Sequence, residues 1–309
     1  MQDPVILFFI FGFFASLLRS NLKVPAAAYE MISLFLLITI GMKGGVELAK
    51  QPFLDLAPQI VVIGLVGFLI PLLLFPILKW LGRFKREDAA SIAAHYGSVS
   101  VGTFAVAVSY MESQGIEYEK YLTVFVVVLE VPAIIVGVLL VKGIKASNQW
   151  SKLAHEVFLG KSILLLLGGL IIGWVAGPEG MVKVQPLFFD LFTGVLALFL
   201  LEMGLVTARQ LSSLKNNVVF LVCFGVLAPL FLAFAGIVIG FSMGLSVGGA
   251  TILGVLLASA SYIAVPAAMR ISIPSANPTL SLAASLGVTF PFNVLIGIPV
   301  YYQMAMAMY

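Results

Sequence analysis

Two short interruptions, rich in serine and glycine, break this very apolar chain, and their residue types could bind a small polar ligand. The first reads Gly-Ser-Val-Ser-Val-Gly-Thr over residues 97–103, and the second reads Ser-Ala-Ser-Tyr-Ile-Ala-Val-Pro over residues 259–266. Hydroxyl side chains donate and accept hydrogen bonds, and glycine lets a ligand approach the backbone amides closely. The free amides at the start of a half-helix also favour an anion. We therefore predict that a small anion binds to Ser98, Ser100, Gly102, Thr103, Ser259 and Ser261.

The two interruptions lie at matching places in the two halves of the chain, because Ser98 and Ser100 have the same offset from Ser259 and Ser261. Inside a bilayer, irregular backbone is tolerated only where protein encloses it or where it lines a cavity. Paired breaks are therefore the best sequence indication of a secondary transporter's binding site. The alternative is that the small residues only allow two helices to cross closely.

Glu130 is a carboxylate inside a predicted span, roughly 16 Å from its end at 1.5 Å per residue. A carboxylate at that depth is costly and by default functional, binding a cation or carrying a proton. The alternative is a protonated side chain bonded to a neighbouring helix. Pro132 frees a carbonyl that could help to ligate sodium, and Asn293 is interpreted as the second half's version of Glu130. The predicted cation-binding residues are Glu130, Asn293, Thr103, Asn277 and Tyr262, with a sodium ion near Ser100, Glu130 and Ser261.

Asn277 belongs to a distinctive string, Ile-Pro-Ser-Ala-Asn-Pro at residues 273–278. The two prolines predict an extended connection, in which Ser275 or Asn277 either caps the next helix or binds an ion through its side-chain oxygen. His95 adjoins the first interruption, where it either tunes the charge of the site or is structural.

We predict ion pairs in two further groups of charged side chains. Glu202 lies nearer the end of its predicted span, and we expect it to pair with Arg209 or Lys215. Lys43 and Glu47 are one helical turn apart, and we expect them to form an interfacial ion pair.

The composition defines the elements that must position these residues. Of 309 residues, 61% are hydrophobic and 10% are charged, whereas soluble domains average about 45–50% apolar and about 25% charged residues. The chain is therefore an integral membrane protein. Because a bilayer-spanning helix needs roughly 20 apolar residues, we predict ten spans, at residues 4–19, 26–49, 56–80, 88–111, 119–142, 159–177, 186–208, 217–241, 247–269 and 277–305.

Weak internal similarity divides these spans into two halves of five. Gly67-Phe-Leu-Ile-Pro71 is repeated as Gly225-Val-Leu-Ala-Pro229, and an odd number of spans inverts the second copy. The predicted fold is thus an all-α polytopic membrane protein with ten transmembrane helices in a 5+5 inverted repeat, of which the fourth and ninth are broken. The predicted units are residues 1–142, a cytoplasmic linker at 143–157, and residues 158–309.

The basic residues indicate the orientation of the chain. All but four of the 17 Lys and Arg residues fall on one side of a ten-span topology, and the exceptions are Lys43, Lys50, Lys120 and Lys183. By the positive-inside rule, the basic side is cytoplasmic and both termini lie outside. We expect a multi-pass protein of the bacterial inner membrane.

Several functions are excluded or disfavoured by what the chain contains. There is no phosphate-binding Walker loop, and two histidines with one cysteine do not make a zinc site. The net charge of +3 gives no reason to expect a nucleic-acid partner. We therefore expect no enzyme and no cofactor other than sodium as a coupling ion. A channel is the other class of membrane conductor, but paired breaks favour a carrier.

Four stretches carry a resemblance to a known family: residues 41–45, 112–119, 241–244 and 273–278. Over nearly its whole length the chain resembles the sodium-dependent bicarbonate permeases of the cyanobacterial SbtA type. This resemblance implies a gate part and a core part, with the broken fourth and ninth helices crossing at mid-membrane. It also implies homotrimers, sodium-driven anion import by an elevator-like movement, and a PII-like regulatory partner, for which the linker at 143–157 is short.

The resulting hypothesis is sodium symport of a small anion, most specifically bicarbonate, into the cell. Tyr262 stands where the family has an aspartate, and this suggests a first alternative, a proton-coupled or sodium-independent carrier of another small organic anion. A second alternative, of another class, is a non-transporting membrane sensor or scaffold.

Overall fold

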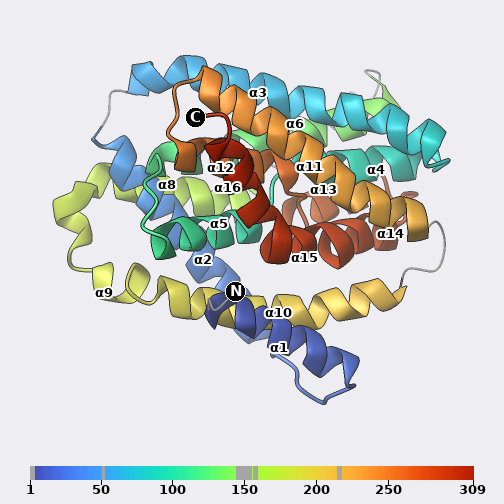
Figure 1. Cartoon of the computed structure of the whole chain (residues 1–309), viewed down its shortest axis with the longest axis horizontal. Coiled ribbons are helices and arrows are strands. Elements are labelled where there is room, and N and C mark those ends of the chain that lie inside the picture. The colour runs from blue at the N-terminus through green and yellow to red at the C-terminus, as the bar shows by residue number, and fades with distance from the viewer. Residues whose placement is uncertain (1–3, 51–52, 144–154, 156–158, 214–217) are drawn as a thin grey trace.

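The computed structural model describes residues 4–50, 53–143, 155, 159–213 and 218–309, and every regular element among them is helical. The predicted linker at 143–157 lies outside the described residues except for Gly143 and His155. The all-helical class predicted from the sequence is therefore confirmed for the described part of the chain (Figure 1).

The helices of the first part follow the predicted spans closely. They are α1 (Pro4–Leu17), α2 (Ala26–Leu48), α3 (Phe53–Pro76) with a π-helical continuation (Ile77–Leu81), α4 (Arg86–Gly97), α5 (Val101–Ser113), and α6 (Thr123–Lys142) after a 3-10 turn (Lys120–Leu122).

The second part contains α8 (Lys161–Met181), α9 (Gln185–Phe188), α10 (Phe192–Ser213), α11 (Val218–Ser242), α12 (Val247–Ala258), α13 (Ala264–Ser272) and α14 (Pro278–Leu282). The last helix continues through π-helical segments at Ala283–Thr289 and Asn293–Gly297 around α15 (Phe290–Phe292), and ends with α16 (Ile298–Met306). Within α8, Gly177 has φ +61° and precedes Pro178. Because glycine adopts a positive φ at little cost, the helix is kinked where the predicted span at 159–177 ends.

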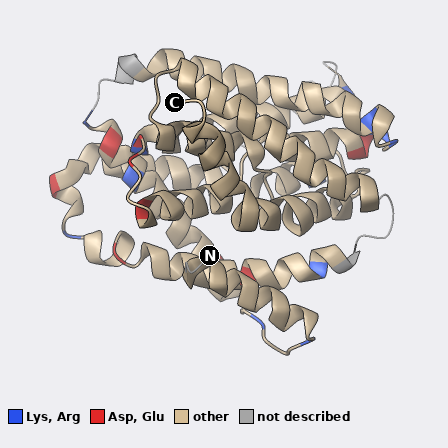
Figure 2. Ribbon diagram, in the orientation of Figure 1, with Lys and Arg blue, Asp and Glu red and all other residues tan. Residues whose placement is uncertain are grey.

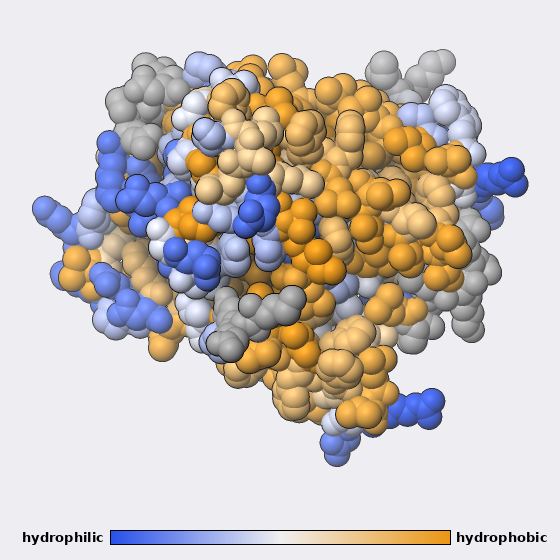
Figure 3. Space-filling model, viewed as in Figure 1, coloured by the Kyte–Doolittle hydropathy of each residue, from blue (hydrophilic) through white to orange (hydrophobic). Residues whose placement is uncertain are grey.

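Eight described helical segments are long and apolar enough to cross a membrane, and the two remaining predicted spans fall on shorter apolar helices, α1 and α12. Charged residues gather mainly at the two ends of the bundle (Figure 2). Large apolar side chains are exposed between those ends, as on Leu65, Phe231 and Val175, and they form a wide hydrophobic surface (Figure 3). The chain is a multi-pass membrane protein.

Glycines allow two pairs of helices to pack with their backbones in contact. A Cβ atom on Gly12 of α1 would overlap the carbonyl oxygen of Leu201 in α10, and one on Gly41 of α2 would overlap that of Leu166 in α8. Close approach through small residues is the usual way in which helices associate in a bilayer. Helix α1 therefore lies along α10 (Figure 1), and α2 lies along α8.

Two helical groups enclose the interrupted segments. Helices α3, α4 and α6 pack against one another, and α11 packs against α12 and the last helix. Tyr96 of α4 connects these groups, because its hydroxyl lies 2.6 Å from Oγ1 of Thr289, which in turn donates a 2.8 Å hydrogen bond to the carbonyl of Gly225. No sequence pattern indicated this link between residues far apart in the chain.

Candidate functional site

The first predicted interruption is a break between two helices. Helix α4 ends at Gly97, Ser98 is extended (φ −93°, ψ 177°), and α5 begins at Val101. Ser100 is the N-cap of α5, and its hydroxyl oxygen accepts hydrogen bonds from the amide of Thr103 at 3.0 Å and from its hydroxyl at 2.9 Å. A serine N-cap satisfies amides that would otherwise be unpaired at a helix start, so the sequence itself specifies this break.

The second predicted interruption is also a break. Helix α12 ends at Ala258, and α13 begins only at Ala264. The hydroxyl of Ser259 donates a 2.7 Å hydrogen bond to the carbonyl of Leu256, and Oγ of Ser261 accepts a 3.4 Å hydrogen bond from the amide of Val265. The two serines thus satisfy backbone groups on opposite sides of the gap.

The two breaks are in direct contact. The amide of Ser100 donates a 2.9 Å hydrogen bond to Oγ of Ser259, and the amide of Ser261 donates a 2.8 Å bond to the carbonyl of His95. All five predicted hydroxyl residues are buried: Ser98, Ser100, Thr103, Ser259 and Ser261. The structure therefore brings the predicted anion-binding residues together at one place.

Gly102 lies beneath the side chain of Tyr262. A Cβ atom at position 102 would overlap the Tyr262 hydroxyl and would come within 2.8 Å of the Phe199 ring. Tyr262 is held edge-on against Phe290, with ring centroids 5.5 Å apart. The glycine is therefore required by the tyrosine of the opposite break, a relationship that spacing alone did not indicate.

A small cavity lies between the Gly102–Tyr262 pair and helices α2 and α10. It has a volume of about 10 Å³, close to the space of one water, and it is lined by Gly102 and Ile263 of the breaks and by Leu36 and Phe199 of α2 and α10. The breaks thus lie at the boundary between the helices that carry them and the group formed by α1, α2, α8 and α10.

Four buried side chains at or beside the breaks have a polar atom without a hydrogen-bond partner among the described residues. These atoms are Oγ of Ser98, Oε2 of Glu130, Nε2 of His95 and the hydroxyl oxygen of Tyr262. Since buried polar groups are nearly always hydrogen-bonded, these four are the groups best suited to bind a ligand.

The helical periodicity of α6 places Glu130 level with the first break. On one face of α6, Gly137 packs against Ala94 and Ala133 packs against Gly97. Glu130 is the next residue along that face, and it therefore faces the part of the chain that follows Gly97. Its side chain is 1% exposed, and no described residue forms an ion pair with it.

Asn293 is buried beside the second break, but its amide is already bonded. Nδ2 donates a 2.9 Å hydrogen bond to the carbonyl of Ala258, and Oδ1 accepts a 2.7 Å bond from the Tyr301 hydroxyl. Because Ala258 is the last residue of α12, Asn293 holds the end of that helix in place.

Asn277 is not brought together with the breaks. Its side-chain oxygen accepts a 3.0 Å bond from the amide of Thr279, which makes it the N-cap of α14. Its own amide donates to Asp88 at 2.7 Å, in the first turn of α4, whereas the first break follows the last turn. The two alternatives for this residue were capping or ion binding, and the contacts are those of a cap.

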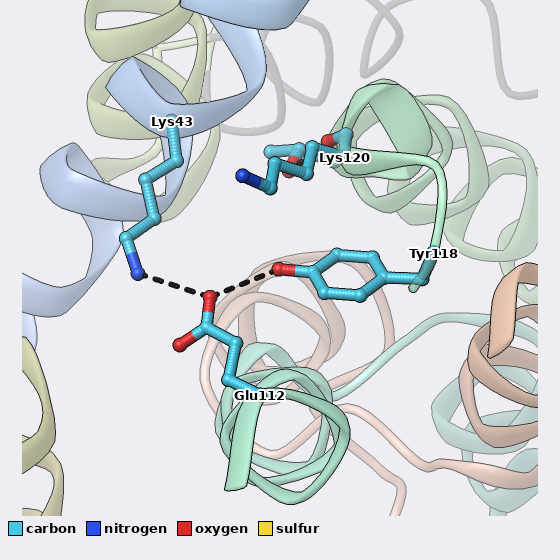
Figure 4. Close-up of polar contacts among 5 residues, drawn as sticks. Lys43, Glu112, Tyr118 and Lys120 are labelled. Atoms are coloured by element: carbon cyan, nitrogen blue, oxygen red, sulfur yellow. Dashed lines mark hydrogen bonds and ion pairs between the residues drawn. The ribbon is translucent and has the colours of Figure 1, made fainter. Parts of the chain in front are cut away.

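The expected ion pair between Lys43 and Glu47 is wrong. Lys43 instead lies 3.5 Å from Glu112 and 4.3 Å from the centre of the Phe192 ring, whereas Glu47 pairs with Lys50 at 2.9 Å. Figure 4 shows Lys43 and the Tyr118 hydroxyl converging on the same carboxylate oxygen of Glu112.

The expected pair between Glu202 and Arg209 is present at 3.9 Å. The position of Glu202 near the basic end of its span predicted this pair, whereas the partner of Lys43 comes from another part of the chain.

Long apolar helices with charged ends and two touching, buried breaks define a multi-pass membrane protein with an enclosed polar site. Residues 4–306 match the family model of the Na+-dependent bicarbonate transporter superfamily, so the chain belongs to that superfamily. The resemblance predicted from four short stretches is thereby confirmed. A comparison with curated proteins finds no match.

Proposed function

We propose that this protein is a secondary active transporter that imports bicarbonate by sodium symport across a bacterial inner membrane. The proposal rests on family membership and on one structural observation. The hydrogen bond from Ser100 to Ser259 joins two broken helices into a single buried polar site.

The chemistry of the breaks suits a small oxyanion. The Ser98 hydroxyl has no described partner, and the N-termini of α5 and α13 follow the two breaks directly. Amides and partial positive charge at helix starts stabilise negative charge. We assign the anion to Ser98, Ser100, Gly102, Thr103, Ser259 and Ser261, as the sequence predicts.

Sodium would bind beside the anion. A carboxylate in a bilayer must be neutralised by a proton or a cation, and Glu130 faces the first break with an unpartnered oxygen. We assign the coupling ion to the region of Ser100, Glu130 and Ser261. A cation there compensates the charge of both the carboxylate and the substrate, which gives a physical reason for coupled movement.

The helix packing supports the 5+5 inverted repeat as a proposal. Gly12 and Gly204 meet where α1 crosses α10, and Gly41 and Gly169 meet where α2 crosses α8. Each crossing therefore joins one helix from each half through a pair of glycines. An inverted repeat would relate these two crossings, with units at residues 1–142 and 158–309.

The same packing suggests how the binding site becomes accessible from one side of the membrane and then from the other. We assign α1, α2, α8 and α10 to a gate part and the remaining spans to a core part that carries both breaks. An elevator-like movement of the core past the gate would expose the small cavity beside Gly102 and Phe199. We also propose that both termini lie outside, as the distribution of basic residues predicts. The family resemblance supports a homotrimer and regulation by a PII-like partner.

Reconstitution tests the function directly. Purified protein in proteoliposomes is supplied with radiolabelled bicarbonate or with small carboxylates, with an inward sodium gradient or a matched potassium gradient. We expect accumulation of bicarbonate that requires the sodium gradient. Uptake of a carboxylate without sodium would favour the first alternative carrier, and no uptake of any anion would favour a sensor or scaffold.

A further inference from the structure

A second pocket lies beside the second break, and the proposed transport site does not use it. Its volume is about 110 Å³, and its walls include Ser91 and His95 of α4, Pro266 and Arg270 of α13, and Pro274. A water molecule in the liquid occupies roughly 30 Å³, so a small anion fits in this space.

The pocket adjoins the joined breaks through His95. The carbonyl of His95 accepts a 2.8 Å hydrogen bond from the amide of Ser261, and His95 is also one of the residues that line the pocket. At the other end, the wall is formed by Pro274, which is exposed. The pocket therefore leads from the breaks toward the end of the bundle where α13 ends and α14 begins, the side that we assign to the cytoplasm.

The imidazole of His95, beside this pocket, has an unused acceptor. The side chain is 1% exposed, and Nδ1 lies 2.7 Å from the carbonyl oxygen of Ser91. A carbonyl only accepts, so Nδ1 carries the hydrogen, and in the neutral ring Nε2 is then an acceptor. Nε2 is buried and has no hydrogen-bond partner in the described part of the chain.

Arg270 supplies the positive charge. It is the only charged residue of the sequence after Asn216, it lies in the last turn of α13, and it forms no ion pair with a described residue. A guanidinium binds a planar oxyanion through two parallel hydrogen bonds. The residues of the pocket thus combine the parallel N–H donors of the Arg270 guanidinium with the buried acceptor of His95.

We propose that this pocket is a second anion subsite, selective for a small oxyanion that carries a hydroxyl hydrogen. The two charged oxygens of hydrogencarbonate would face Arg270, and its hydroxyl would donate to Nε2 of His95. The subsite receives the anion between its release from the breaks and its exit to the cytoplasm. This inference rests on the proposed function, because it takes bicarbonate as the transported anion.

The subsite predicts an effect on one side of the membrane only. Initial rates of radiolabelled bicarbonate transport are measured in right-side-out and inside-out membrane vesicles, for the wild type, Arg270→Gln and His95→Phe. We expect KM at the cytoplasmic face to rise about tenfold in each variant, the size of one charge-assisted hydrogen bond, with KM at the outer face unchanged. Lys85→Gln, which removes another basic side chain from the same side, is the matched control and should leave both values unchanged.

The outcomes separate this inference from the proposed function. If the wild type shows no sodium-dependent bicarbonate flux in either kind of vesicle, the proposed function fails. If that flux is present but Arg270→Gln leaves the cytoplasmic KM unchanged, or raises both KM values equally, the subsite is overturned. Because Arg270 is exposed, this variant decides the matter even if the buried His95→Phe variant does not fold.

Discussion

The backbone amide of Ser100 donates a 2.9 Å hydrogen bond to the side-chain oxygen of Ser259, although the two residues belong to different halves of the chain. The bond satisfies a buried amide that α4 and α5 leave unpaired between them. Together with the bond from the Ser261 amide to the His95 carbonyl, it fixes the two broken helices relative to one another.

Ser259→Ala should destabilise the protein, because it leaves the Ser100 amide buried without an acceptor. An unpaired buried group costs about 1–3 kcal/mol, so we expect a clear fall in Tm of the purified protein. Ser98→Ala is the matched control. Its hydroxyl has no described partner, so its removal should leave Tm unchanged while weakening bicarbonate uptake. Equal falls in Tm for the two variants would contradict this interpretation.

Gly102→Ala should disrupt the site sterically, because the new methyl group overlaps the Tyr262 hydroxyl. Forcing extra volume into a packed interior costs about 1–3 kcal/mol, and we expect most uptake activity to be lost. The double variant Gly102→Ala with Tyr262→Phe should recover part of it, since the hydroxyl is gone. Gly168→Ala serves as the control, because a Cβ atom there meets nothing within 4 Å. A Gly102→Ala protein with normal uptake kinetics would show that the two breaks are not closely packed in the working protein.

Glu130→Gln should remove sodium dependence without unfolding the protein. The substitution keeps the size of the side chain and removes a buried charge whose burial is costly, so Tm should not fall. Uptake should no longer respond to a sodium gradient, and Glu130→Ala should likewise abolish coupled uptake. Glu30→Gln, an exposed change on α2, should behave like the wild type. Normal sodium-coupled uptake by Glu130→Gln would refute the role of Glu130.

Tyr118 should make the protein sensitive to strong alkali. Burial, and then the neighbouring Glu112, raise the pKa of its phenol above the ordinary value of 10.0. A raised pKa in the folded state means that this stabilisation is complete below pH 10 and is lost as pH rises further. The Tm difference between the wild type and Tyr118→Phe should therefore shrink above about pH 10. A difference that stays constant through that range would show that the pKa of the phenol is not raised in the folded protein.

The sequence predicted the breaks because their cause is local. Glycine and small hydroxyl residues cluster at the first break, and Ser100 caps the following helix with its own side chain. The burial of Glu130 followed from its position within a long apolar run. Both conclusions depended on near neighbours in the chain.

The contacts between helices could not be predicted in the same way. Apolar helices can pack in many registers, so nothing local indicates that Tyr262 covers Gly102 or that Lys43 pairs with Glu112 and not with Glu47. The capping role of Asn277 was one of two alternatives, and only its contact with Thr279 separates them. The arrangement of ten spans as two inverted repeats stays a prediction.

Equilibrium binding of radiolabelled bicarbonate to the purified protein tests most directly whether the joined breaks hold the substrate. We predict saturable binding to the wild type that sodium strengthens, and binding weakened about tenfold in Ser98→Ala, the size of one hydrogen bond to a charged group, at an unchanged Tm. Binding that is equal in the two proteins, or indifferent to sodium, would contradict the account.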